Sequence, residues 1–124
     1  MRKMLIVDDN ALFRKALRAS LHSQFPSLVV SEAKDGTEAL ETIPTFLPHM
    51  ILMDIHLSNE SGLELTRSIK GLFPDIKVIL LTSYDLPEYQ KAAFQYKADH
   101  CMSKDSFLEL MNLNLILSEG PVGW

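Results

Sequence analysis

This chain of 124 residues has little of several features that would indicate a particular class of protein. It has a single cysteine, Cys101, which excludes an internal disulfide and is more natural in a reducing compartment. Its 12 basic residues are outnumbered by 16 acidic ones, which gives a net charge of -4. A free-standing nucleic-acid-binding protein is usually basic, so this balance argues against that class.

Long apolar runs are also missing near the start of the chain. The apolar residues 4–7 number only four before two aspartates interrupt them. A secretory signal needs about 7–15 uninterrupted apolar residues, and a membrane span needs about 20. We therefore expect a cytoplasmic protein with no membrane partner.

What is present fits one globular domain. Hydrophobic residues make up 47% of the chain and charged residues 23%, which is too apolar for disorder. Short apolar segments alternate with segments of helical period. The predicted strands are Met4–Val7, Leu28–Val30, Met50–Met53, Lys77–Leu81 and His100–Met102. Strict alternation of this kind predicts an α/β fold, with a parallel sheet and helices on both of its faces.

The predicted helices follow each strand. They run from Leu12 to Leu21, from Thr37 to Ile43, from Ser61 past Leu72, from Asp85 to Tyr96, and from Ser106 to Leu117. Pro44 and Pro48 are expected to stop the second helix, and residues 58–61 to form a polar loop. Capping boxes, Ser61 with Glu64 and Asp85 with Glu88, are expected to start the next two helices.

Polar and charged residues stand at the ends of the predicted strands. They are Asp8 and Asp9 after the first strand, Asp54 after the third, Thr82 and Ser83 after the fourth, and Lys104 after the fifth. Taken singly, each has an ordinary explanation as a helix cap, a turn or a strand residue. Together they should meet at one rim, because the carboxyl ends of parallel strands lie at the same edge. Three carboxylates would repel one another there, and a divalent cation such as Mg²⁺ would relieve the repulsion.

This combination resembles the receiver domain of bacterial two-component response regulators. The resemblance is carried by Asp8-Asp9, by Asp54 with Gly62 eight residues later, by Leu-Leu-Thr82-Ser83, and by Lys104. It covers residue 3 to about residue 117, so we expect a receiver domain over 1–119, with 120–124 as a tail or the start of a linker. It implies the flavodoxin-like (βα)5 fold, with strand order 2-1-3-4-5.

The resemblance also implies roles for these residues. Asp54 would accept a phosphoryl group from a sensor histidine kinase or a phosphotransfer protein. Asp9 would bind Mg²⁺ (or Mn²⁺) directly and Asp8 mainly through water, with Asp54 and the backbone carbonyl of His56 completing the protein ligands. The domain would then be a switch that catalyses only its own phosphorylation and dephosphorylation, and not an enzyme with a separate substrate.

Two further side chains would contact the phosphoryl group. Lys104 would pair with Asp54 and then with a phosphoryl oxygen, and the Thr82 hydroxyl would bind another oxygen. Such groups neutralise charge that spreads over the equatorial oxygens during transfer.

The chain departs from the family pattern at several positions. Ser58 stands where proline is usual, which predicts a less rigid loop, and Lys97 stands where glycine is common. Cys101 replaces the aromatic residue that normally moves with the threonine, so either another route relays the movement of Thr82 or the domain switches weakly. Asp105-Ser106 after the lysine resembles receivers joined to a LuxR-type DNA-binding domain.

Other functions and partners stay open at this point. The chain could be the regulatory fragment of a DNA-binding response regulator, although this chain alone is expected to bind no nucleic acid. A Mg²⁺-dependent phosphohydrolase is a less favoured alternative, because His56 stands where such enzymes need a second acid. Leu113 and Ile116 give the last helix a second apolar side, which suggests a homodimer through the fourth helix, the fifth strand and the last helix.

Overall fold

A sheet of five parallel strands forms the centre of the molecule, in a computed structural model that describes residues 2–83 and 87–112. The strands are β1 (Lys3–Val7), β2 (Val29–Ala33), β3 (Met50–Asp54), β6 (Lys77–Thr82) and β7 (His100–Ser103). They lie in the order β2-β1-β3-β6-β7, and every neighbouring pair is parallel. Because β6 and β7 are the fourth and fifth strands of this sheet, the predicted order 2-1-3-4-5 is confirmed.

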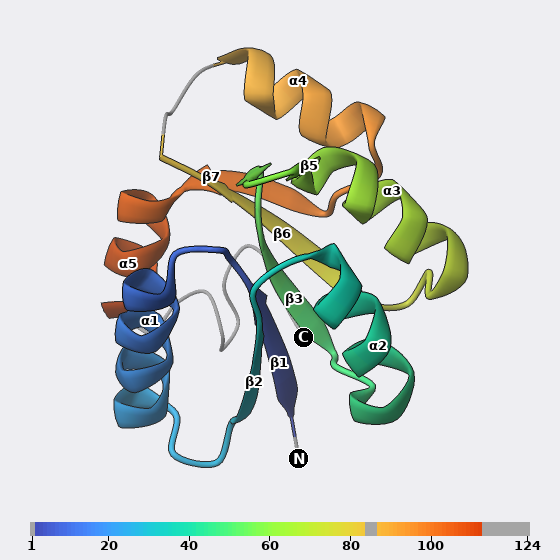
Figure 1. The fold of residues 1–124 in the computed structure, drawn as a ribbon. Helices are drawn as coiled ribbons and strands as arrows, with labels where there is room; N and C mark the ends of the chain where they lie inside the picture. The colour runs from blue at the N-terminus through green and yellow to red at the C-terminus, as the bar shows by residue number, and fades with distance from the viewer. Residues whose placement is uncertain (1, 84–86, 113–124) are drawn as a thin grey trace.

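Helices cover both faces of the sheet, as predicted (Figure 1). They are α1 (Ala11–Gln24), α2 (Gly36–Phe46), α3 (Gly62–Leu72), α4 (Pro87–Gln95) and α5 (Lys104–Asn112). One apolar cluster joins the sheet to α1 and α5 through Leu17, Leu21 and Phe107. The other cluster joins the opposite face to α2, α3 and α4.

The alternation of side chains along β1 explains this layering. Met4 and Ile6 belong to the cluster with α1 and α5, whereas Leu5 and Val7 belong to the cluster on the other face. Successive residues of a strand point to opposite faces, so a strand covered on both sides is apolar throughout. All five residues of β3 are buried for the same reason. This packing holds the ends of β1 and β3 side by side.

The second strand overlaps the predicted one but starts one residue later and extends three residues further. It covers Val29–Ala33 and not Leu28–Val30, because Ser31 and Glu32 continue the pairing with β1. β2 is an edge strand, and four of its five residues are only partly buried. Polar residues are therefore tolerated there, and an apolar run alone does not reveal the strand.

The prediction that Pro44 stops the second helix was wrong. α2 runs from Gly36 to Phe46, with Pro44 inside it. Proline removes one backbone donor, but the fully buried side chains of Ala39 and Ile43 hold the helix against the sheet. The helix ends instead at Leu47, which has a left-handed φ of 51° and whose N–H donates to the Ile43 carbonyl at 2.8 Å.

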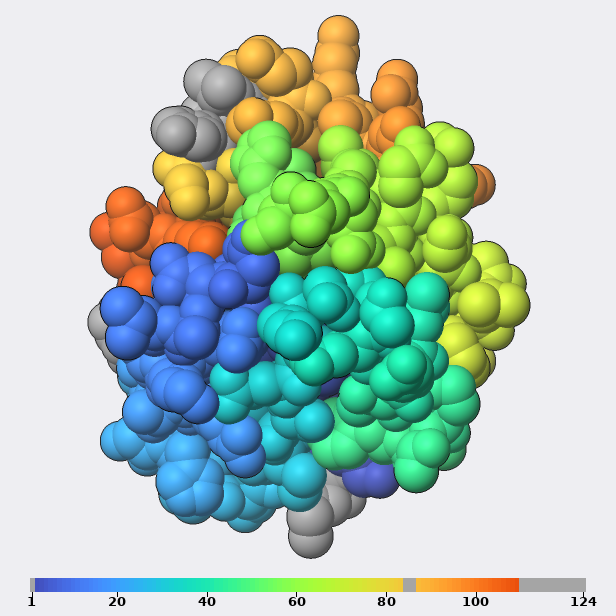
Figure 2. All heavy atoms as spheres, viewed as in Figure 1, coloured from blue at the N-terminus to red at the C-terminus, as the bar shows by residue number. Residues whose placement is uncertain are grey.

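The segment predicted as a polar loop is a short hairpin. β4 (His56–Leu57) pairs antiparallel with β5 (Glu60–Ser61). In the space-filling view, green atoms lie directly above the place where the blue and cyan regions of the chain meet (Figure 2). Ser61 caps α3, and its hydroxyl accepts from the Leu63 N–H at 3.2 Å, which confirms that part of the predicted capping box.

The last helix begins earlier than predicted. α5 begins at Lys104, two positions before the predicted Ser106, because the Ser103 hydroxyl accepts from the Ser106 N–H at 3.0 Å. The predicted cap at Asp85 and the predicted helical residues 113–117 lie outside the described residues.

A prediction follows from Lys97, whose φ is 73° where α4 turns towards β7. The left-handed region costs a residue with a Cβ about 1–2 kcal/mol, and glycine enters it freely. We expect Lys97→Gly to raise the free energy of unfolding by about 1 kcal/mol in urea titrations. Lys97→Ala keeps the Cβ and should give no gain, so equal stabilisation by both variants would contradict the explanation.

Candidate functional site

The residues at the strand ends meet at one rim of the sheet, as predicted. Asp8 and Asp9 follow β1, Asp54 ends β3, Thr82 ends β6, and Lys104 follows β7. Oxygen atoms of Asp8, Asp9 and Asp54 all lie within 4.8 Å of one another. The shared direction of the strands produces this convergence, since each strand delivers its last residue to the same edge.

Asp54 is a buried carboxylate whose pKa is raised by its surroundings. Its side chain is about nine-tenths buried (residue exposure 7%), and its Oδ1 accepts from the His56 N–H at 3.2 Å. Burial, followed by the charge of Asp8, raises the pKa of Asp54 from 3.8 to about 6. The positive charge of Lys104 and the His56 hydrogen bond oppose this rise without cancelling it. A proton on Asp54 therefore competes with any cation just below neutral pH.

Lys104 binds Asp8 more closely than Asp54. Its Nζ lies 2.9 Å from Asp8 Oδ2 and 3.8 Å from Asp54 Oδ2. The second oxygen of Asp8, Oδ1, accepts from the Asn10 N–H at 2.8 Å. The ammonium also lies 4.2 Å from the ring centroid of Phe13, a cation–π arrangement that keeps it at the rim. One positive charge is thus shared by two buried carboxylates.

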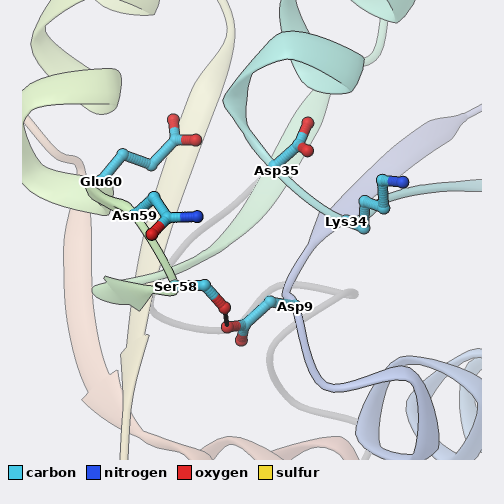
Figure 3. A pocket seen from close by; sticks show the side chains of 6 residues that line it. All are labelled: Asp9, Lys34, Asp35, Ser58, Asn59 and Glu60. Carbon is cyan, nitrogen blue, oxygen red and sulfur yellow. Dashed lines mark hydrogen bonds between the residues drawn. The ribbon is translucent and has the colours of Figure 1, made fainter.

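Asp9 faces solvent and is held from the other side. It is exposed, and its Oδ2 accepts a hydrogen bond from the Ser58 hydroxyl on the β4–β5 hairpin (Figure 3). Asp9 is therefore the carboxylate of the group that is open to an incoming cation, and a neighbouring element fixes its orientation.

The remaining predicted site residues differ in exposure. Thr82 is almost completely buried at 1% exposure, whereas the neighbouring Ser83 is exposed. The His56 side chain is exposed and points to α4, where its Nε2 lies 3.0 Å from the Tyr89 hydroxyl. The two rings meet edge to face with centroids 5.5 Å apart. His56 thus contacts Asp54 through its backbone and α4 through its ring.

Sequence reasoning missed three neighbours of the site. Phe13 and Tyr89 lie inside the predicted helices, Leu12 to Leu21 and Asp85 to Tyr96, and not at a strand end. Arg14 was not singled out, yet its guanidinium donates to the Asp8 backbone carbonyl at 2.5 Å and forms a salt bridge with Glu32 at 3.0 Å. Helical spacing placed these residues on α1 and α4, but spacing does not show which strand end a helix passes.

The donor set fits a hard divalent cation. Asp8, Asp9 and Asp54 offer carboxylate oxygens within a small space, and all-oxygen sites of this kind suit Mg²⁺ and Mn²⁺. Lys104 balances only part of the negative charge that these three groups carry when ionised. The site is therefore built to accept further positive charge, or to hold protons in its absence.

A doubly wound α/β fold with an acidic rim at its carboxyl ends defines the class of this domain. Within that class, a family model for the response regulator receiver domain matches residues 4–114. The chain belongs to this family. Receiver domains are signalling switches and not metabolic enzymes, so the phosphohydrolase alternative is not supported.

The curated relatives of this chain include response regulators and transcriptional regulatory proteins. The response regulator protein VraR of Staphylococcus saprophyticus is 39% identical over 82 residues, which are 66% of this chain and 39% of the relative. The uncharacterized transcriptional regulatory protein YhcZ of Bacillus subtilis is 36% identical over 104 residues, which are 84% of this chain and 49% of the relative. The chain spans less than half the length of either relative.

A solved structure supports the same family. A response regulator protein from Burkholderia pseudomallei, with a phosphorylated aspartic acid, a calcium ion and citrate, superposes with a TM-score of 0.77 at 29% identity. The match covers 87% of this chain and 65% of that one.

Within residues 2–83 and 87–112, no helix is both long and apolar enough to span a bilayer. The cytoplasmic location stays a prediction.

The raised pKa of Asp54 predicts how stability depends on pH without metal. Between about pH 4 and 6 the folded state holds a proton that the unfolded state has lost, so stability falls as pH rises through that window. At about pH 7.5 the full cost, on the order of 3 kcal/mol, is present. We expect Asp54→Asn to be more stable than the unchanged protein by that order in urea titrations with chelator, and by about half as much at pH 5.

Two controls accompany that measurement. Asp75→Asn removes an exposed carboxylate and should leave stability nearly unchanged at both pH values. Added Mg²⁺ should stabilise the unchanged protein more than Asp54→Asn and so narrow the gap. An Asp54→Asn variant that is the less stable protein in chelator at about pH 7.5 would contradict the charge-repulsion explanation.

Proposed function

We propose that this domain accepts a phosphoryl group on Asp54 from a histidine kinase or a phosphotransfer protein, with Mg²⁺ or Mn²⁺ at the acidic rim. Asp8, Asp9, Asp54 and the backbone carbonyl of His56 would hold the cation. The observation that carries the proposal is the position of Asp54, which lies at the end of β3, buried, and near both Lys104 and the Asp8–Asp9 pair.

The proposed transfer needs an ionised Asp54. A carboxylate oxygen of Asp54 forms a bond to phosphorus while the bond between phosphorus and the donor's histidine nitrogen breaks, and that nitrogen keeps the electron pair. With its pKa raised to about 6, Asp54 is mostly ionised at neutral pH and more basic than an ordinary carboxylate. A bound divalent cation would supply neutralisation of the charge that the carboxylates and the phosphoryl oxygens share.

Lys104 and Thr82 have separate tasks in this scheme. Lys104 lies 3.8 Å from Asp54 and can shift from Asp8 towards a phosphoryl oxygen once the cation neutralises the aspartates. Thr82 ends the strand beside β3 and supplies a hydroxyl donor from a buried position. Donors that reach the phosphoryl oxygens stabilise the negative charge that develops there during transfer.

The change at Asp54 has to reach the surface by some route. Cys101 on β7 is buried with 9% exposure and is far smaller than an aromatic ring. The His56–Tyr89 contact offers a direct path, because His56 binds Asp54 Oδ1 through its N–H and Tyr89 of α4 through its ring. We propose that this contact transmits the effect of phosphorylation from Asp54 through His56 to α4.

The proposed output face comprises α4, β7 and α5. Phe94 on α4 is 84% exposed, which supports a second copy of the chain covering this face. Leu113 and Ile116, which suggested the homodimer from the sequence, lie outside the described residues. Within the described residues, the support for a homodimer therefore comes from the exposed Phe94 of α4.

A second candidate concerns the whole protein. The curated relatives include a transcriptional regulator and are more than twice as long as the part that this chain matches. We propose that the receiver covers 1–119, that 120–124 form a tail or linker, and that the domain regulates DNA binding by a further domain of a longer protein. Measuring the length of the encoded gene product would test this directly.

The phosphoacceptor is tested by mass. Incubation with Mg²⁺ and acetyl phosphate or phosphoramidate should add one phosphoryl group to the intact chain, because Asp54 is the ionised nucleophile at the rim. Asp54→Asn should abolish the adduct, and Asp75→Asn, which alters an exposed carboxylate far along the chain, should keep it. An adduct of equal yield in Asp54→Asn would refute the assignment.

The proposed route to α4 is tested by removing one hydroxyl. Tyr89→Phe keeps the ring but loses the contact with His56 Nε2, so phosphorylation should alter hydrogen exchange of α4 amides less than in the unchanged protein. Tyr96→Phe, whose ring packs against Arg67, is the matched control and should respond normally. If both variants respond alike, with equal adduct yields, the contact does not carry the change.

A further inference from the structure

The β4–β5 hairpin is fastened to the rest of the molecule at two points. On one side the Ser58 hydroxyl donates to Asp9 Oδ2, and on the other Glu60 Oε2 accepts from the Gly36 N–H at 3.1 Å. Figure 3 shows Asp9, Ser58 and Glu60 around one polar pocket of about 260 Å³, which Lys34, Asp35 and Asn59 also line. The hairpin thereby connects the end of β1 to the start of α2.

We propose that Ser58 is a positioning residue for Asp9, and that Glu60 holds the hairpin that carries Ser58. This inference rests on the proposed function, since it assigns to Asp9 the role of metal ligand. Ser58 contacts neither the phosphoacceptor nor its donor in this scheme, and acts only through the carboxylate of Asp9.

The chemistry of the Asp9 carboxylate supports this role. Asp9 is exposed, so without a partner its side chain would sample several rotamers, and binding a cation would cost the entropy of fixing one of them. The Ser58 hydroxyl occupies one lone-pair position of Oδ2, and an ionised carboxylate has about four such positions. The rest of the carboxylate stays available, so the hydrogen bond orients the ligand without blocking it.

Glu60 is held by the first turn of α2. The opening N–H groups of a helix have no partner within the helix, and the Glu60 carboxylate accepts one of them from Gly36. Gly36 leaves the necessary room, because a Cβ at that position would lie 1.9 Å from Glu60 Oε1. Asp35 caps a second donor of this turn, because its Oδ1 accepts from the Glu38 N–H at 2.9 Å.

The main test measures Mg²⁺ affinity of the full chain by titration calorimetry. Ser58→Ala should raise the Kd for Mg²⁺ about three- to ten-fold, the range that one net hydrogen bond supplies. Ser58→Thr keeps the hydroxyl and should restore near-normal affinity. Ser27→Ala, an exposed serine in the turn before β2, is the matched control and should bind Mg²⁺ normally. A Ser58→Ala variant with unchanged Kd would overturn the proposal.

A double-variant cycle tests the part played by Glu60. Glu60→Ala should speed hydrogen exchange of the Gly36 amide and weaken Mg²⁺ binding, whereas Glu60→Gln keeps an oxygen acceptor and should change both less. Because Glu60 acts through Ser58, Ser58→Ala combined with Glu60→Ala should bind Mg²⁺ no more weakly than Ser58→Ala alone. Additive losses would show that Glu60 affects the metal by another path and would contradict the proposed chain of contacts.

The phosphoryl adduct on Asp54 separates this proposal from the proposed function. If the unchanged protein binds Mg²⁺ and forms the adduct while Ser58→Ala keeps its affinity, only the positioning role is overturned. If the unchanged protein neither binds Mg²⁺ nor forms the adduct, the proposed function fails, and the positioning role fails with it.

Discussion

Repulsion among three carboxylates at one end of a parallel sheet is the constraint on which the site depends. Asp8, Asp9 and Asp54 have oxygens within 4.8 Å of one another because strands β1 and β3 run side by side in one direction. The backbone at these strand ends cannot move apart without breaking the sheet. The ammonium of Lys104 offsets part of this repulsion, and the rest contributes to the raised pKa of Asp54, which is about 6. Neither effect prevents the rim from binding a cation.

The apolar clusters on the two faces of the sheet hold the strand ends in place. β1 and β3 are packed from both faces, so the backbone at their ends has little freedom to relax the repulsion. α5 starts directly at Lys104, where Ser103 caps it, and the ring of Phe13 lies beside the ammonium. The positive charge is thus held by a helix start and an aromatic ring, at a place set by the same core.

Two carboxylates of the rim are linked by hydrogen bonds to different surface elements. Asp9 is linked through Ser58 to the β4–β5 hairpin, and Asp54 is linked through the His56 backbone to Tyr89 of α4. A change in charge at the rim therefore acts on two elements at once. The family relationship accounts for the acidic rim, whereas these two links depend on side chains that this chain has at Ser58, His56 and Tyr89.

The fold class, the strand order through a family resemblance, and the residues at the strand ends could be predicted from the sequence, because burial on two faces leaves apolar runs that stop abruptly at Asp8 and Asp54. The polar continuation of the edge strand β2, the continuation of α2 through Pro44 and the hairpin at Ser58 could not, since partner elements and not local pattern set them. The position of Lys104, 2.9 Å from Asp8 but 3.8 Å from Asp54, is likewise a property of the folded chain. Charge pairing depends on distance in space, and spacing along the chain carries no measure of it.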